Sequence, residues 1–161
     1  MSEAASIEAY VRGLPKAELH VHLQGAASVP TVLELARRYP EAGVPTEVQG
    51  LRDFYMFTDF AHFIEVYLRV NRLVRSADDV RDLVVGLGRD LTDVNVRYAE
   101  VTVTADSHLL MGIAPDALAD ALTSGRAHVL DAYDIELAWV FDIPGELGVP
   151  SGIRTIEWAE S

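Results

Sequence analysis

Cysteine is absent from the 161 residues of the sequence. Disulfide bonds and thiolate ligands are therefore excluded, so a bound metal ion would depend on histidine and carboxylate side chains. Long apolar runs are also missing, because no stretch approaches the ~20 residues of a membrane span, and residues 1–6 are acidic. These absences predict a cytoplasmic protein that has no membrane partner.

Positive charge is scarce. The chain has 13 Lys and Arg residues against 25 Asp and Glu, which gives a net charge of −12. This balance argues against nucleic-acid backbones and anionic membrane surfaces as partners and favours a small, neutral or weakly charged substrate. Half of the residues are hydrophobic, enough to bury the core of one domain.

The most informative stretch, residues 14–25, contains His20 and His22 separated by a single residue. In a β-strand these two side chains point the same way and lie roughly 7 Å apart along the chain. The alternate positions are apolar, as expected of a strand buried on both faces in a parallel sheet: Ala17, Leu19, Val21 and Leu23. A single histidine is more often structural, but two that converge at the end of a strand predict a metal site.

Strand and helix patterns alternate along the rest of the chain. Further strands are expected at 95–104 and 135–142, and helices at 6–12, 28–36, 60–74, 76–94, 115–130 and 152–159. We expect the helix at 6–12 to cover the bottom of a barrel. The order predicts an α/β fold: residues 1–161 form a single partial domain, the N-terminal part of a (β/α)8 TIM-type barrel. About three of the eight units are present, since a full barrel needs about 250 residues.

Several side chains outside the strand of the histidine pair have expected roles. Ser76 and Asp79 resemble a capping box at the start of a helix. Glu100 is either a structural acid paired with an arginine, which we favour, or a group that supports the residues of the site. Asp142 either contacts a ligand or caps its loop. The other histidines are all expected on the surface: His62 and His128 on helices, and His108 in a loop at 105–112 on the catalytic face.

Aromatic residues are concentrated between positions 51 and 60. The segment either packs as a short helix on the core or closes over a substrate. In the helix that follows, six apolar positions are expected to face the core: Phe60, Phe63, Ile64, Tyr67, Leu68 and Val74.

Residues 15–26 read Pro-Lys-Ala-Glu-Leu-His-Val-His-Leu-Gln-Gly-Ala and resemble the opening signature of the adenosine deaminase family, a zinc-dependent branch of the amidohydrolase barrels. Residues 96–100, Val-Arg-Tyr-Ala-Glu, are similar to the second strand of that family. The resemblance implies that His20 and His22 bind Zn²⁺ together with a third histidine and an aspartate. It also implies that an activated water attacks C6 of an adenine-type base and that a glutamate transfers protons as ammonia leaves.

The further ligands and the catalytic residues match no position here and would lie beyond Ser161. No catalytic residue is therefore assigned within the chain, and we expect the 161-residue chain alone to have little or no activity. Three readings remain: the N-terminal part of a deaminase, an inactive barrel fragment that binds metal weakly or binds a partner chain, and another amidohydrolase with a His-x-His pair. The sequence predicts no oligomeric state.

Gln24 departs from the family pattern, in which an aspartate usually contacts the 5′ region of the sugar. The candidate substrate contacts are His22, Gln24, Phe54 and Phe57. The neutral amide, the aromatic segment and residues 141–146 resemble the branch that acts on aminodeoxyfutalosine (6-amino-6-deoxyfutalosine), whose 5′ group carries an aromatic acid. Adenosine itself is the alternative substrate.

Overall fold

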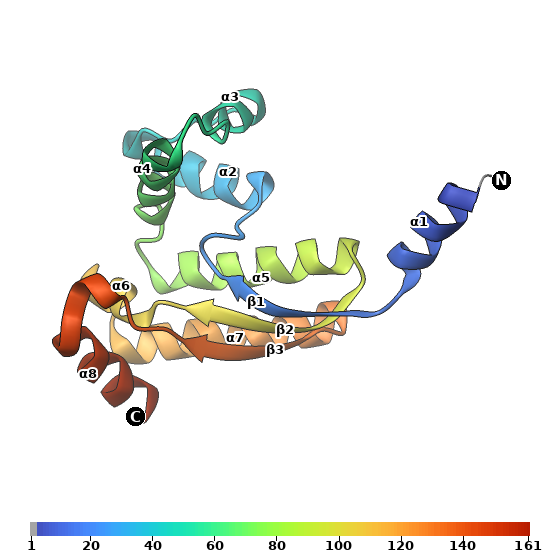
Figure 1. Ribbon diagram of the computed structural model, residues 1–161. Coiled ribbons are helices and arrows are strands. Elements are labelled where there is room, and N and C mark those ends of the chain that lie inside the picture. Colours follow the sequence, from blue (N-terminus) through green and yellow to red (C-terminus); the bar gives the residue numbers. More distant parts are fainter. Residues whose placement is uncertain (1–2) are drawn as a thin grey trace.

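The computed structural model describes residues 3–161 and contains one parallel sheet (Figure 1). Its strands are β1 (Lys16–His22), β2 (Val96–Val103) and β3 (Glu136–Phe141), hydrogen-bonded in that order. All three expected strands are confirmed, and the second and third are each one residue shorter at either end than expected. The chain enters each strand from the same end, so the carboxyl ends of all three lie at one edge of the sheet.

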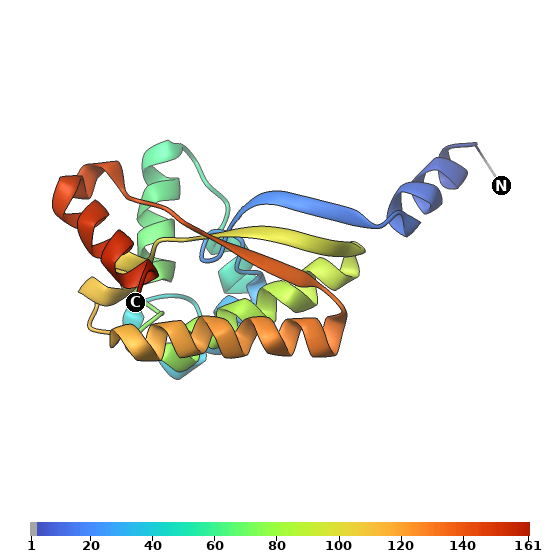
Figure 2. The ribbon, with the colours of Figure 1, turned by 90° about the horizontal axis from the view of Figure 1, so that it is seen from below.

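Eight α-helices lie within the described residues, and two of them pack on the sheet. Helices α5 and α7 lie side by side along one face of the sheet (Figure 2). The helices are α1 (Glu3–Gly13), α2 (Val29–Arg38), α3 (Val48–Phe54), α4 (Phe60–Asn71), α5 (Ala77–Asp93), α6 (Ala105–Leu110), α7 (Pro115–Tyr133) and α8 (Gly148–Ala159). Two short 3-10 turns, Pro40–Ala42 and Gly145–Leu147, complete the list. Within residues 3–161 no helix is both long and apolar enough to cross a membrane.

Helices α5 and α7 approach closely because glycines stand where they meet. A Cβ atom on Gly88 would lie 2.5 Å from Cγ2 of Val129, and one on Gly125 would lie 2.9 Å from Cβ of Val84. Side chains at either glycine would push the helices apart. The sequence predicts that six apolar residues of this helix face the core: Val80, Leu83, Val84, Leu87, Leu91 and Val94. The first five are buried in α5, whereas Val94 follows the end of the helix and is 52% exposed.

Strand β1 is more exposed than its pattern predicts. Leu19 is 64% exposed, Ala17 is exposed, and Val21 is only half-buried. Strands of a parallel sheet are buried when elements cover both faces, but within residues 3–161 β1 is an edge strand whose outer side chains are not covered. The prediction of a strand buried on both faces is therefore wrong for this chain.

Two helices also differ from expectation. Helix α1 extends away from the sheet (Figure 1), and Ile7 and Tyr10 are 59% and 67% exposed, so it does not cover the bottom of the strands. In α4 the buried residues are Val66 and Val70, whereas Phe60 is 76% exposed. The expected core stripe is wrong for its five positions on α4, because the helix lies beyond the end of the sheet rather than on it (Figure 1). It is correct for Val74, which follows the helix and is 1% exposed in the core.

The segment at 105–112 is not a loop, since α6 follows β2 almost directly. The carboxylate of Asp106 is buried and accepts two hydrogen bonds, of 2.6 and 2.8 Å, from the guanidinium of Arg154 on α8. His108 is 1% exposed, and neither of its ring nitrogens has a hydrogen-bond partner within the described residues. The surface position expected for His108 is wrong, and burial lowers its pKa to about 4.

The remaining polar predictions have mixed outcomes. His128 is exposed as expected, whereas His62 is half-buried and its Nδ1 lies 3.3 Å from the backbone nitrogen of Thr58. Glu100 accepts a hydrogen bond of 3.1 Å from the hydroxyl of Tyr98 rather than pairing with an arginine. The Oδ1 atom of Asp142 is buried without a hydrogen-bond partner in the described residues, so this oxygen does not cap the loop.

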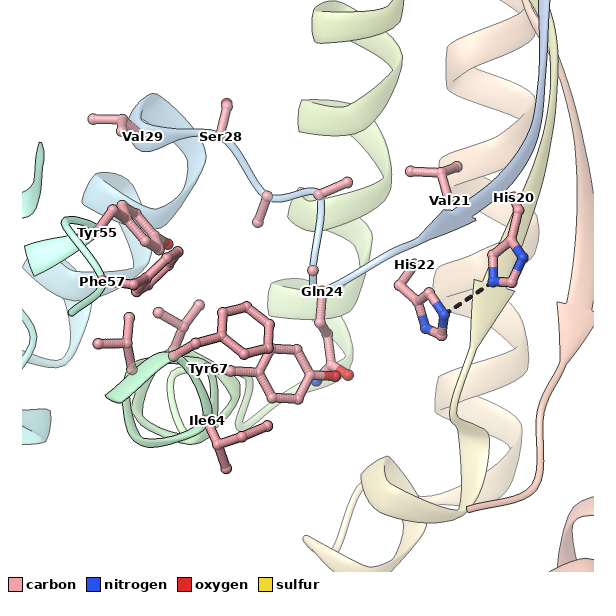
Figure 3. Close-up of a pocket in the computed structure, with 16 residues that line it drawn as sticks. His20, Val21, His22, Gln24, Ser28, Val29, Tyr55, Phe57, Ile64 and Tyr67 are labelled. Atoms are coloured by element: carbon pink, nitrogen blue, oxygen red, sulfur yellow. Dashed lines mark hydrogen bonds between the residues drawn. The ribbon is translucent and has the colours of Figure 1, made fainter. Parts of the chain in front are cut away.

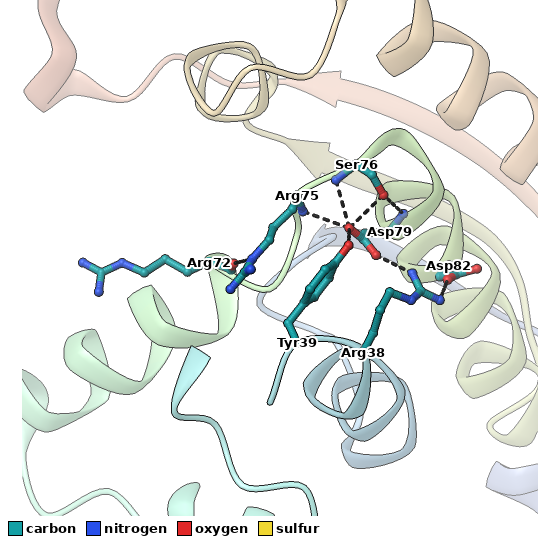
Figure 4. A network of polar contacts seen from close by, with 7 residues as sticks. All are labelled: Arg38, Tyr39, Arg72, Arg75, Ser76, Asp79 and Asp82. Atoms are coloured by element: carbon teal, nitrogen blue, oxygen red, sulfur yellow. Dashed lines mark hydrogen bonds and ion pairs between the residues drawn. The ribbon is translucent and has the colours of Figure 1, made fainter. Parts of the chain in front are cut away.

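The capping box at Ser76 and Asp79 is confirmed and belongs to a larger polar network (Figure 4). The buried Asp79 carboxylate accepts hydrogen bonds from the hydroxyl of Tyr39 (2.8 Å), the backbone nitrogens of Arg75 and Ser76 (2.9 Å each) and the guanidinium of Arg38. Burial alone would raise the pKa of Asp79, but these bonds outweigh it and hold the pKa below its usual value. The network joins the end of α2 to the start of α5.

The Asp79→Asn substitution is expected to lower the free energy of unfolding by about 2–3 kcal/mol, because it removes charge-assisted hydrogen bonds at a buried site. The pKa of Asp79 is depressed in the folded state, so its contribution is complete above a pH of about 4 and is lost as the pH falls further. Urea unfolding across this range measures both effects. The matched control is Asp78→Asn, on the exposed neighbour in the same helical turn. Equal losses in the two variants would contradict the role assigned to the network.

The burial of His108 predicts a second pH dependence of the free energy of unfolding, at higher pH than that of Asp79. Between about pH 6.5 and pH 4 the unfolded chain binds a proton that buried His108 does not, so stability falls as the pH is lowered, by up to about 3 kcal/mol. His108→Leu is expected to remove this part of the slope. His128→Leu, at an exposed position on α7, is expected to leave the slope unchanged. A wild-type slope in the His108 variant would refute the assignment.

Candidate metal centre and substrate pocket

The two histidines stand at the carboxyl end of β1 and converge as the sequence predicts. Their Nε2 atoms are 3.1 Å apart, and the ring centroids are 5.1 Å apart at an angle of 34° between the planes (Figure 3). Pairing of β1 with β2 places Val21 beside Val101 and His22 beside Thr102, which fixes the direction of the strand where it carries the pair. The ring nitrogens thus lie much closer together than the strand backbone at the two residues.

The donor geometry of this pair fits a divalent metal ion. Zinc–nitrogen bonds of about 2.0–2.1 Å and bond angles of about 90–110° place two ligand nitrogens roughly 2.9–3.4 Å apart. The observed separation of 3.1 Å lies within this range, and both imidazoles are exposed to the adjoining cavity. The set is incomplete, because within residues 3–161 no group of three or more histidine and carboxylate side chains is placed to hold a metal.

A cavity of about 760 Å³ adjoins the histidine pair (Figure 3). This volume is typical of small-molecule sites. Its wall comes from the end of β1, the turn that follows, the segment between α3 and α4, and α4 itself. The lining residues are His20, Val21, His22, Gln24, Gly25, Ala26, Ala27, Ser28, Val29, Tyr55, Phe57, Phe63, Ile64, Val66, Tyr67 and Val70. Most of these side chains are apolar, so the cavity suits a flat organic ligand.

The predicted substrate contacts separate into two groups. His22, Gln24 and Phe57 line the cavity, and Gln24 is 9% exposed in the turn after β1. Phe54 does not line the cavity but packs half-buried against the hydrophobic core, where the guanidinium of Arg69 lies 6.0 Å from its ring centroid. The segment is therefore divided: Phe54 packs against the core, whereas Phe57 lines the cavity, and its contact with a substrate stays a prediction.

Three aromatic residues of the cavity were missed from the sequence: Tyr55, Phe63 and Tyr67. Burial raises the pKa of Tyr55 to about 12, so its hydroxyl remains protonated at neutral pH. Phe63 and Tyr67 are one helical turn apart on α4, and this signal was visible in the sequence. The sequence predicts a core position for both residues, because helical periodicity alone does not distinguish a face that meets the core from one that lines a cavity.

Comparison with known proteins identifies relatives of this chain. The sequence model described as adenosine deaminase matches residues 15–148. An aminodeoxyfutalosine deaminase from Streptomyces avermitilis is 46% identical over 153 residues, which cover 95% of this chain and 43% of that protein. One from Streptomyces coelicolor is also 46% identical, over 95% of this chain and 40% of the relative. The chain thus spans less than half the length of these relatives.

More distant proteins share the fold. An amidohydrolase from Burkholderia ambifaria with bound Zn aligns with a TM-score of 0.83 at 24% identity, over 99% of this chain and 44% of that one. An adenine deaminase from Arthrobacter aurescens aligns with a TM-score of 0.74 at 19% identity, over 90% of this chain and 46% of that one.

The alignments confirm that the three βα units are part of a (β/α) barrel. The family model covers all three strands of the sheet, including β1 with the histidine pair. The two Streptomyces relatives are deaminases. The chain belongs to the adenosine deaminase family of hydrolases.

Proposed function

We propose that this chain is the N-terminal part of a zinc-dependent hydrolytic deaminase that converts aminodeoxyfutalosine to its 6-oxopurine product and releases ammonia. The observation that carries the proposal is the pair of imidazole nitrogens, 3.1 Å apart, at one end of an apolar cavity. In this proposal residues 1–161 form a single partial barrel domain of a cytoplasmic enzyme, and its partner is a small-molecule purine nucleoside.

His20 and His22 would hold Zn²⁺ through Nε2, and the ligands that complete the site would come from later strands of the barrel. When bound, Zn²⁺ lowers the pKa of water to near neutrality and so supplies a nucleophile for the carbon that bears the amino group. The residues of this chain position the substrate. The apolar wall would exclude water from the flat base, and the Gln24 amide, which lines the same cavity, could donate to or accept from the sugar.

Two observations favour aminodeoxyfutalosine over adenosine. The relatives that are 46% identical are named for that substrate, whereas adenine deaminases are more distant, for example 26% identical in Cupriavidus metallidurans. Gln24 also places a neutral amide where adenosine deaminases usually carry an aspartate, which fits an altered 5′ group. An inactive fragment and another type of amidohydrolase are the outcomes against which the proposal is tested.

Removal of either histidine is expected to abolish zinc binding in the full-length protein. His20→Ala and His22→Ala should each lower zinc affinity by more than about 100-fold, because even loss of an outer-shell partner costs 10–100-fold. Zinc content and competition with a chelator measure this change, and His128→Ala is the control. The 161-residue chain alone supplies two imidazoles to this site, His20 and His22, and is expected to bind zinc weakly. Tight one-to-one binding by that chain would show that the ligand assignment is wrong.

The substrate is tested by turnover in the full-length, zinc-loaded protein. We expect ammonia release from aminodeoxyfutalosine with a kcat/KM at least about 100-fold above that for adenosine or adenine, since a site shaped for an additional ring uses that contact in the transition state. Equal or greater kcat/KM for adenosine would refute the substrate assignment. No deamination of any of the three would refute the proposed function.

A further inference from the structure

A wall of aromatic rings lies across the cavity from the histidine pair. Phe57 and Phe63 meet edge to face with centroids 5.2 Å apart, and Phe63 and Tyr67 are stacked with centroids 6.1 Å apart. In Figure 3 Gln24 and Tyr67 lie between His22 and the more distant Phe57. The cavity therefore has a metal-binding end and an aromatic end, and the metal chemistry does not use the aromatic one.

These rings are not core residues. Phe57 and Phe63 are 45% and 37% exposed, whereas Val66 and Val70 on the same helix are 2% and 5% exposed. Phe63, Val66, Tyr67 and Val70 recur at intervals of three and four residues and all line the cavity, so one face of α4 forms its wall. Large apolar side chains that remain exposed inside a cavity mark a surface for a ligand.

The spacing and charge of the wall determine what it can bind. The centroids are 5.2 to 6.1 Å apart, too close for another ring to enter between them, so a further ring must stack on the wall or meet it edge to face. No lysine or arginine is present among the cavity-lining residues of the described chain. The wall therefore offers ring faces and no positive charge, so it would contact the flat ring of an aromatic acid and not its carboxylate.

Gly25 lies near both a metal ligand and a ring of the wall. A Cβ atom on Gly25 would lie 3.4 Å from Cβ of His22 and 4.0 Å from Cε2 of Tyr67. The turn after β1 therefore lies close to both His22 and Tyr67. A molecule with its reacting carbon at the histidine pair and a ring at its other end would span this turn.

We infer that Phe57, Phe63 and Tyr67 form a subsite that stacks on an aromatic group of the substrate remote from the carbon that loses ammonia. The inference rests on the proposed function, which places that carbon at His20 and His22. Aminodeoxyfutalosine carries such an aromatic group, and adenosine does not. The ring wall is therefore a specificity determinant of this site rather than part of its catalytic machinery.

The test uses Phe63→Leu and Phe57→Leu in the full-length, zinc-loaded protein. The ratio of kcat/KM for aminodeoxyfutalosine to that for adenosine is expected to fall about 5- to 10-fold in each variant, mainly through KM, because one aromatic contact is lost. The matched control is Phe60→Leu. The Phe60 ring also stacks on Phe63, at 5.9 Å, but it is 76% exposed and does not line the cavity.

The outcomes separate the inference from the function on which it rests. A ratio that is unchanged in Phe63→Leu, or that falls as far in Phe60→Leu, overturns the subsite. Dissociation constants for the two nucleosides, measured on the protein without zinc, give the same ratio when turnover is too slow. An enzyme that deaminates neither nucleoside contradicts the proposed function, while the ratio of dissociation constants still decides whether the rings recognise an aromatic group.

Discussion

Pairing of β1 with β2 is the constraint on which the site depends. Backbone hydrogen bonds hold β1 extended, and in an extended chain alternate side chains share a face, so His20 and His22 point to one place. A shift of the pairing by one residue would turn both rings to the opposite face. The position of β2 is in turn fixed by the layer of α5 and α7, which pack tightly because Gly88 and Gly125 have no side chains.

The parts of the fold with local signals could be predicted from the sequence. Ser76 and Asp79 cap α5 through atoms three residues apart, and the stripe of α5 is buried because the helix packs against α7 and β2. The strands at β2 and β3 follow from runs of β-branched and aromatic residues. The convergence of the histidine pair was also predictable, because it depends only on the two-residue period of a strand.

The parts that could not be predicted depend on distant contacts. His108 is buried in α6, and α6 is tied to α8 by Asp106 and Arg154, which are 48 residues apart in the chain. No local sequence pattern predicts that ion pair. On α4 the sequence places Phe63, Ile64 and Tyr67 on one apolar face, but a hydrophobic pattern reports that a face is apolar and not what packs against it. Phe63 and Tyr67 face a cavity, whereas the stripe of α5 faces a core.

Under the proposed function, the exposed side of β1 and the incomplete ligand set have one explanation. A parallel barrel has no edge strands, so the elements that would cover Leu19 and pair with the free edge of β1 are later parts of the same barrel. A catalytic zinc ion needs at least one protein ligand beyond His20 and His22, and those later strands end at the same rim. Zinc would then link the first strand to the last ones, so that metal binding would stabilise closure of the barrel as well as support its chemistry.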